Sequence, residues 1–323
     1  ITKMKFSELA AQWILSVSHG VEESTLAHYR YTLERYLLPV FGSDRLSDLD
    51  EQRLEQGILQ VISAASGRHK PLGASSSREC LTMLRRICKY AAHLHLMRSM
   101  EVFVKLPQMG TNQTKPFSPQ EQAEVQEFVL AAPTPRKAGL LLQMQLGLRI
   151  GEVCGLQWGD FDFKAGILTV RRTVSRIYCG VGCTKIVVQT PKTKSSGREI
   201  PIPHDLAALL RKLRGNAGPD TWFLSGSTEK PVEPRCYRKS IRGYLRRAGV
   251  RRVHPHALRH TFATTCLQSG CDIKTLSEIL GHADANVTLK RYVHTDMKRK
   301  KTEMQRVFSA VWKKRPAQTP MPA

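Results

Sequence analysis

Arg149 is the first residue whose setting suggests chemistry. It stands between two glycines in the segment GLRIGE, directly after an apolar run. A guanidinium in such a place is costly to bury unless it meets an anion or a carboxylate. Glu152 lies three residues later and could orient either Arg149 or a nearby histidine. The alternative is a structural Arg–Glu pair that closes a helical turn.

A second group of chemically capable residues lies near the end of the chain. His256 and Arg259 occur in HALRHT, and on a helix that begins after Pro255 they share one face, with an imidazole beside a fork of donors. A solvated basic helix edge is the alternative. His282 follows in LGH, and Tyr292 lies ten residues after it. A tyrosine at helical spacing usually packs in a core or an interface, so Tyr292 alone does not indicate catalysis.

Two lysines occupy a polar turn between these groups. The segment TPKTKSSG, residues 190–197, joins two predicted strands and should project Lys192 and Lys194 from a hairpin tip. Exposed lysines of this kind are usually solvated. Beside a phosphodiester, however, an ammonium group could donate a proton to a leaving oxygen. The pattern does not choose between the two lysines.

The charge balance indicates the class of partner. Fifty Lys and Arg residues against 27 Asp and Glu give the 323-residue chain a formal charge of +23. Nucleic acid is the commonest polyanion that offsets such an excess. An anionic membrane surface is the alternative, but the basic residues are spread over several segments and form no amphipathic membrane-facing helix. The apolar runs are shorter than the roughly 20 residues of a bilayer span, and the N-terminus lacks a secretory pattern. We therefore expect a cytoplasmic protein with no membrane partner.

The eight cysteines do not indicate a metal centre. Only Cys179 and Cys183, in CGVGC, approach the spacing of metal ligands, and no second pair completes a set of four. We expect reduced thiols, no metal and no cofactor. The chain also has no glycine-rich phosphate loop of either nucleotide-binding type.

The predicted elements divide the chain in two. Apolar residues recur at helical intervals in four early segments, which predict a small helical bundle: residues 6–17, 24–42, 46–66 and 75–97. Periodicity is lost around KLPQMGTNQTKP, which is typical of a linker. Ser118, Pro119 and Glu121 then form the signature of a helix start with a capping box and a first-turn proline.

The second part of the chain mixes helices with a few strands. Its predicted strands are residues 167–174, 185–190 and 198–203, and its later helices are residues 204–215, 234–250, 256–270, 272–282 and 286–294. The fold class is therefore mainly α with a small antiparallel β-sheet, in two domains. The limits we predict are a helical domain at 1–105, a linker at 106–116, a second domain at 117–300 and a tail at 301–323.

The order of the motifs adds a resemblance. An Arg in LGLRIGE, a Lys in a turn, HALRH, LGH and then a Tyr resemble the tyrosine recombinase, or phage-type integrase, family over about residues 117–294. The resemblance implies a helical core-binding domain that contacts DNA, followed by an α+β catalytic domain. It also implies a site of Arg149 and Arg259 as phosphate clamps, Lys192 as general acid, His256 as an aid to proton transfer, His282 as a phosphoryl hydrogen-bond donor, Tyr292 as nucleophile and Glu152 as an accessory carboxylate.

The implied activity is site-specific DNA recombination, which integrates or excises a mobile element such as a phage or a conjugative transposon. A covalent 3′-phosphotyrosine conserves the phosphodiester bond energy, so neither ATP nor a metal is needed. The resemblance implies double-stranded attachment-site DNA as partner, a tetrameric synapse built around a Holliday junction, accessory DNA-bending or excision factors, and a nucleoid-associated location in a bacterium. Two alternatives are a non-catalytic basic DNA-binding regulator and a type IB topoisomerase.

The ends of the chain carry two further expectations. The tail spaces apolar residues as a helical stripe, which could pack on its own domain or, as the resemblance favours, dock onto a neighbouring protomer: Met304, Val307, Phe308, Val311 and Trp312. The chain begins with Ile1 instead of Met, which would fit the loss of an N-terminal arm-binding module, and the sequence leaves open whether one was removed.

Overall fold

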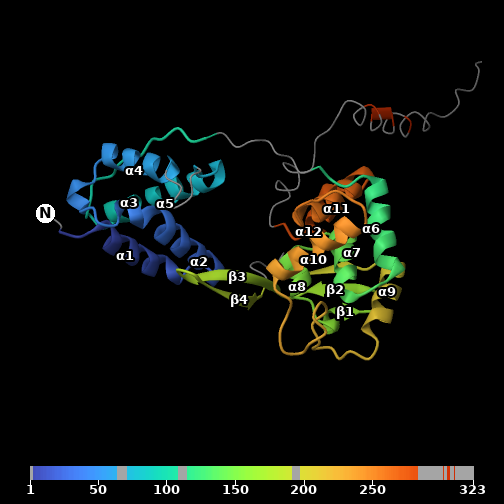
Figure 1. The fold of residues 1–323 in the computed structure, drawn as a ribbon. Helices are drawn as coiled ribbons and strands as arrows, with labels where there is room; N and C mark the ends of the chain where they lie inside the picture. Colours follow the sequence, from blue (N-terminus) through green and yellow to red (C-terminus); the bar gives the residue numbers. More distant parts are fainter. Residues whose placement is uncertain are drawn as a thin grey trace, which may run out of the picture.

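The chain builds two separate hydrophobic cores. The computed structural model describes residues 3–63, 71–107, 115–190, 197–282, 301, 304–305 and 309. In Figure 1 the N-terminal core lies on the left and the C-terminal core on the right. Most of the predicted linker and tail falls outside the described residues, so the predicted domain limits stay predictions. None of the helices that the structure describes has the length and apolar character of a membrane span.

The N-terminal core is a bundle of helices. Its elements are α1 (Phe6–Ser18), α2 (Glu23–Thr32), a π-helical turn (Leu33–Leu37), α3 (Leu38–Phe41), a 3-10 turn (Leu46–Asp48), α4 (Glu51–Ser63) and α5 (Ala74–His93). The second predicted helix is divided by the π turn just before Pro39. Proline has no N–H to donate and its ring crowds the carbonyl one turn back, so the wider turn relieves that contact. Leu9, Leu37, Leu54 and Leu84 meet in the core.

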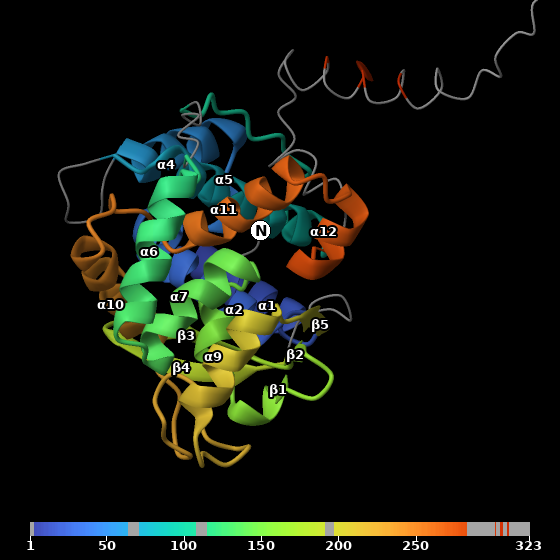
Figure 2. The same cartoon turned by 90° about the vertical axis from the view of Figure 1, so that its right-hand side faces the viewer.

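The C-terminal core is also mainly helical, as predicted. Its elements are α6 (Pro119–Ala131), α7 (Pro135–Gln145), α8 (Ile150–Cys154), a 3-10 turn (Trp158–Asp160), β1 (Phe161–Asp162), β2 (Ile167–Val170), β3 (Thr173–Gly180), β4 (Cys183–Gln189), β5 (Arg198–Pro201), α9 (His204–Arg214), α10 (Pro234–Arg247), α11 (His256–Gln268) and α12 (Ile273–Leu280). The predicted capping box of α6 is present: the Ser118 hydroxyl accepts from the Glu121 amide at 3.1 Å, and the Glu121 carboxylate accepts from the Ser118 amide at 2.8 Å. Figure 2 shows α6, α7, α9 and α11 together on the face turned to the viewer.

The strands form two antiparallel sheets where one was predicted. One sheet has the order β1-β2-β5, and β3 pairs with β4 in a separate hairpin. The prediction of a single strand over residues 167–174 is wrong, because the chain leaves the first sheet at Arg171 and Arg172, where Arg172 donates to Asp160 at 3.1 Å. The prediction of a hairpin tip at residues 190–197 is also wrong. β4 pairs with β3 and β5 pairs with β2, so the two strands that flank this segment do not form a hairpin with each other.

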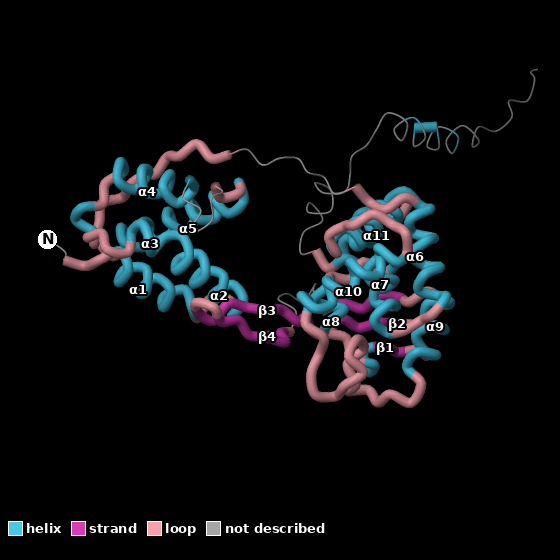
Figure 3. The backbone as a smooth tube through the Cα atoms, in the orientation of Figure 1, coloured by secondary structure: helices cyan, strands magenta, loops and turns pink. Residues whose placement is uncertain are grey.

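The β3–β4 hairpin connects the two cores. Figure 3 shows it in magenta, extending from the C-terminal domain to the N-terminal bundle. At its far end the Tyr178 hydroxyl donates to Glu34 at 2.5 Å, and the Tyr178 ring meets the Tyr31 ring edge to face at 5.3 Å between centroids. Lys185 forms an ion pair with Glu23 at 2.5 Å. The bundle therefore contacts the C-terminal domain through α2 and the turn after it.

Candidate active site

Arg149 is placed by a sharp turn between two helices. Gly147 follows α7 with a φ of +68°, and a Cβ there would lie 2.5 Å from the Phe262 ring, so only glycine fits. Arg149 then directly precedes α8. Its backbone amide and its Nη1 each donate to the Glu152 carboxylate at 2.8 Å. The predicted Arg–Glu pair is thus present, with the Arg149 side chain 38% exposed and the Glu152 side chain 6% exposed.

Arg198 is a second arginine bound to Glu152, and the sequence did not predict it as a site residue. Its Nη1 and Nη2 donate to the two oxygens of Glu152, both at 3.0 Å, and the Arg198 side chain is 6% exposed. Burial by itself would raise the pKa of Glu152, but the Arg198 fork and the charges of Arg149 and Arg259 outweigh it and lower the pKa to about 2. Glu152 is therefore a fixed anion and hydrogen-bond acceptor, and it is unsuited to general-base catalysis near neutral pH. The sequence signal for Arg198 was a lone arginine at the start of the apolar strand REIPIP.

Arg259 and His282 form the second half of the cluster. Arg259 lies on α11 and is 1% exposed, and its Nη1 donates to the Gly147 carbonyl at 2.7 Å. Its Nη2 lies 3.0 Å from Nε2 of His282. Because a guanidinium can only donate, Nε2 of His282 accepts, and the ring carries its proton on Nδ1. That N–H is the donor group of the neutral imidazole.

The C-terminal end of α12 holds all three arginines. The carbonyls of three consecutive residues, Ile279, Leu280 and Gly281, each accept a hydrogen bond from a different arginine. The donors are Arg198 at 2.6 Å, Arg259 at 2.7 Å and Arg149 at 3.3 Å, in that order. Helix ends leave such carbonyls without partners inside the helix, and cations near them interact favourably with the helix dipole. Gly281 ends α12 in the left-handed conformation, with a φ of 64°.

The other predicted site residues are less completely placed. His256 is the first residue of α11, one turn before Arg259, and is exposed. Its position at a helix N-terminus favours a nearby anion. Lys192, Lys194 and Tyr292 lie outside the described residues. The structure therefore brings together Arg149, Glu152, Arg259 and His282, and adds Arg198 to them.

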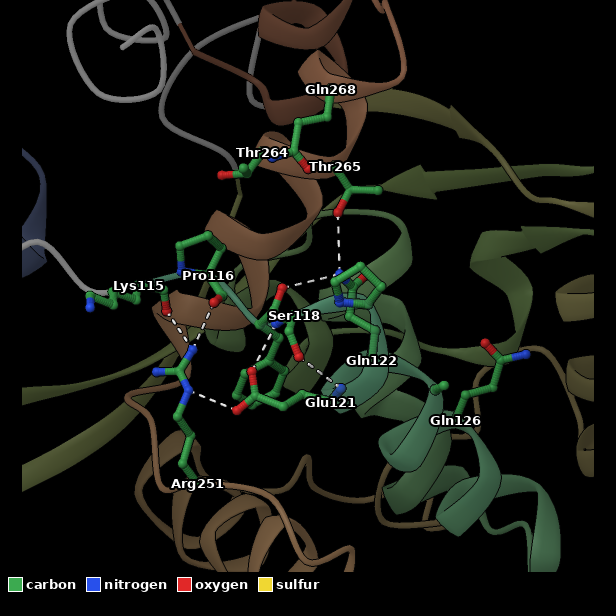
Figure 4. Close-up of a pocket in the computed structure, with 13 residues that line it drawn as sticks. Lys115, Pro116, Ser118, Glu121, Gln122, Gln126, Arg251, Thr264, Thr265 and Gln268 are labelled. Atoms are coloured by element: carbon green, nitrogen blue, oxygen red, sulfur yellow. Dashed lines mark hydrogen bonds and ion pairs between the residues drawn. The ribbon is translucent and has the colours of Figure 1, made fainter. Parts of the chain in front are cut away.

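Two hollows of the C-terminal domain lie away from this cluster. One, of about 710 Å³, is bounded by the start of α6 and by α11, and Arg251 there donates to Glu121 and to two backbone carbonyls (Figure 4). Another, of about 760 Å³, is lined by both apolar and polar side chains and runs between α6, α7, α9 and α11. Within the described ranges, no group of three His, Cys, Asp or Glu side chains is arranged to hold a metal. The cluster itself offers guanidinium and imidazole donors, which suit a phosphate oxygen.

Comparison with known proteins agrees with this chemistry. Residues 120–299 match the phage integrase family, and residues 5–58 match the phage integrase N-terminal SAM-like domain. A "Tyrosine recombinase XerC-like" protein of Caldanaerobacter subterraneus is 35% identical over 183 residues, 51% of this chain and 46% of that protein. The chain thus spans about half the length of that relative. The tyrosine recombinase XerC of Xanthomonas campestris is 25% identical over 290 residues, 87% of this chain and 82% of that protein.

Solved structures share the fold. The Tn1549 transposon integrase, in complex with a circular intermediate DNA, superposes with a TM-score of 0.73 at 21% identity, covering 94% of this chain and 99% of that one. A lambda integrase dimer bound to a core site gives a TM-score of 0.59 at 14% identity, covering 92% and 81%. At these identities the likeness establishes the shared architecture of helical bundle and mixed second domain.

Proposed function

Since the chain belongs to the phage integrase family of tyrosine recombinases, we propose that it is a site-specific DNA recombinase that integrates or excises a mobile element. It would cut and rejoin strands through a covalent 3′-phosphotyrosyl intermediate and a Holliday junction. The observation that supports this most is the convergence of Arg149, Arg259 and His282. Carbonyls at the end of α12 accept from both arginines, Glu152 also accepts from Arg149, and Arg259 contacts His282. We place this reaction in the bacterial cytoplasm, at the nucleoid when the protein is bound to DNA.

In this proposal the cluster binds the scissile phosphate. Arg149 and Arg259 would donate to its nonbridging oxygens, and His282 would donate from Nδ1. Arg149 is the more exposed of the two arginines, so an incoming phosphate meets it first, while the buried Arg259 fixes His282 and adds positive charge behind it. Donors held in advance stabilise the charge of the pentacoordinate transition state without reorganising.

The remaining groups would move protons and form the covalent bond. Tyr292 would attack the phosphorus. A phenol has a pKa near 10, so it needs a cationic field to act as a phenolate near neutral pH, and the arginines supply that field. Lys192 would protonate the departing 5′-oxygen, with Lys194 as the competing candidate, and His256 would assist proton transfer at the N-terminus of α11.

We also propose how protomers assemble into a tetrameric synapse on attachment-site DNA. The apolar stripe of the tail would dock into the groove of about 760 Å³ on a neighbouring protomer. Leu130 is 48% exposed at that groove and Phe262 lines it, so an apolar helix face would cover surface that otherwise meets water. Accessory DNA-bending or excision factors would act on the DNA around this assembly.

A covalent-adduct assay tests the proposal. The protein is incubated with duplex DNA that spans the ends of its element, denatured, and examined for protein bound to a 3′ end. The parent should form the adduct and Tyr292→Phe should not. Tyr178→Phe, a tyrosine at the domain contact, is the matched control and should keep the adduct. An equal yield from Tyr292→Phe would refute the nucleophile. Relaxation of supercoiled DNA without a second recombination site would favour the topoisomerase, and DNA binding with no adduct would favour the regulator.

A further inference from the structure

Two cysteines face each other at the end of the β3–β4 hairpin. Cys179 and Cys183 are both exposed, and their Sγ atoms are 2.6 Å apart. The regular register pairs Tyr178 with Thr184 and would next pair Cys179 with Cys183, but a shift pairs Gly180 with Cys183 instead. The two side chains thus lie across the last turn of the hairpin. A disulfide has an S–S separation of about 2.05 Å, so the two sulfur atoms lie close to bonding distance.

Three other cysteines of the described chain are less suited to such chemistry. Cys80, Cys88 and Cys154 are buried, and burial raises the pKa of Cys80 and of Cys88 to about 12. A thiol in that setting is rarely the thiolate that reacts. Cys236 is exposed, and its Sγ points to the Glu233 carboxylate at 3.7 Å. It therefore provides an accessible thiol for comparison with the pair.

The residues next to the pair make the contact between the domains. Tyr178, which binds Glu34 and packs on Tyr31, precedes Cys179 directly. Lys185, which pairs with Glu23, lies two residues after Cys183. We call these contacts of Tyr178 and Lys185 with the bundle the hairpin latch. In its ion pair the Lys185 side chain is 53% exposed and the Glu23 side chain 51%. Such pairs contribute little to the free energy of the contact unless their side chains are already held in place.

We propose that Cys179 and Cys183 form a reversible disulfide that strengthens the hairpin latch. The oxidant is a low-molecular-weight disulfide of the glutathione class. One cysteine thiolate attacks a sulfur of that disulfide and releases one thiol, leaving a mixed disulfide on the protein. The second cysteine thiolate attacks the protein sulfur, forms the Cys179–Cys183 bond and releases the second thiol. The protein loses two protons and two electrons, and the small disulfide gains them as two thiols.

The bond should act by restricting the hairpin end. Closing so short a loop removes conformations in which Tyr178 and Lys185 turn away from the bundle, so less entropy is lost when the latch forms. Oxidation should therefore raise the fraction of molecules in which Lys185 contacts Glu23. The bond needs no DNA, so its formation can be tested independently of the proposed recombinase activity.

The first test looks for the bond itself. The full-length protein is equilibrated in buffers of increasing oxidised over reduced glutathione, its remaining thiols are alkylated, and it is digested with trypsin. Cleavage after Arg176 and Lys185 releases both cysteines on one peptide, which should appear unalkylated and lighter by two hydrogen atoms. Cys179→Ser and Cys183→Ser should each abolish that species, and Cys236→Ser should leave it unchanged. Mixed glutathione adducts alone, or links between chains, would overturn the proposal.

The second test measures the latch. A zero-length carbodiimide reagent couples Lys185 to Glu23, whose atoms are 2.5 Å apart. The yield should be about threefold higher in oxidised than in reduced protein, because the hairpin end is pre-ordered. The increase should vanish in Cys183→Ser, and Glu23→Gln should remove the cross-link under both conditions. Equal yields from oxidised and reduced protein, despite a confirmed disulfide, would refute the coupling of the bond to the latch.

Discussion

Replacing Glu152 with glutamine tests whether one buried carboxylate holds the arginine cluster together. The carboxylate accepts four hydrogen bonds, two from Arg149 and two from Arg198. An amide of the same size offers one acceptor oxygen and turns its NH₂ toward the remaining donors, so both arginines lose their counter-charge. Removing one partner of a buried pair costs about 3–5 kcal/mol. We expect Glu152→Gln to lower the free energy of unfolding by that amount, and to lower strand cleavage about 100-fold because Arg149 shifts.

The pH dependence gives an independent value for the same interaction. The pKa of Glu152 falls from 4.5 to about 2 in the folded protein, which corresponds to about 3 kcal/mol. Because the folded pKa is the lower one, this stability is fully present above about pH 4.5 and is lost as the pH falls toward 2. Glutamine does not titrate. The free energies of unfolding of the parent and of Glu152→Gln should therefore differ by about 2 kcal/mol less at about pH 3 than at about pH 7.

Urea unfolding of both proteins at several pH values provides the measurement. Glu121→Gln is the matched control, since Glu121 also accepts from the amide three residues before it and from an arginine, Arg251. The Glu121 side chain is 21% exposed, so Glu121→Gln should lower the free energy of unfolding by only about 1 kcal/mol. The reasoning would be refuted if the loss in free energy of unfolding caused by Glu152→Gln stays constant with pH. It would also be refuted if that loss is no larger than the one caused by Glu121→Gln.

Three further predictions follow from the sequence and the structure. Affinity for duplex DNA should fall at least about 10³-fold between about 50 and 200 mM salt, because bound counterions are released, and a flat response in a filter-binding titration would contradict the charge argument. Of Lys192→Ala and Lys194→Ala, only the variant that lacks the general acid should slow strand cleavage and recover with a 5′-leaving group that needs no proton. If both variants recover, or if neither does, another residue is the general acid. Gly147→Ala should lower the free energy of unfolding by about 2–4 kcal/mol, because φ is +68° and the new Cβ meets Phe262. Gly243→Ala, in open space within α10, should stabilise slightly, and equal effects on thermal unfolding would contradict the steric argument.

The features that the sequence predicted correctly depend on residues close together in the chain. The capping box of Ser118 and Glu121 and the pair of Arg149 and Glu152 each involve residues three apart. Such contacts follow from helix geometry alone. The bundle helices were predicted for the same reason, since their apolar residues recur at helical intervals.

The features that were missed depend on strand pairing. Arg198 reaches Glu152 across 46 residues, because β5 pairs with β2 and so places its first residue beside α8 and α12. Alternating apolar residues identify a strand but do not name its partner. The predicted hairpin at residues 190–197 is wrong for the same reason. The alternation does not show that the two flanking strands belong to different sheets.

The end of α12 links the arginine cluster to the residues that follow it in sequence. Arg198, Arg259 and Arg149 hold three successive carbonyls, and His282 is the next residue after them. The contacts that fix the guanidinium groups therefore also fix where the chain leaves α12, ten residues before Tyr292. A change at any of the three arginines should disturb both the phosphate site and the starting point of the segment that carries the proposed nucleophile. Arg198 is buried, and its Nε, Nη1 and Nη2 donate to Ile279 and Glu152. Its contribution to cleavage would therefore come through this positioning and not through contact with DNA.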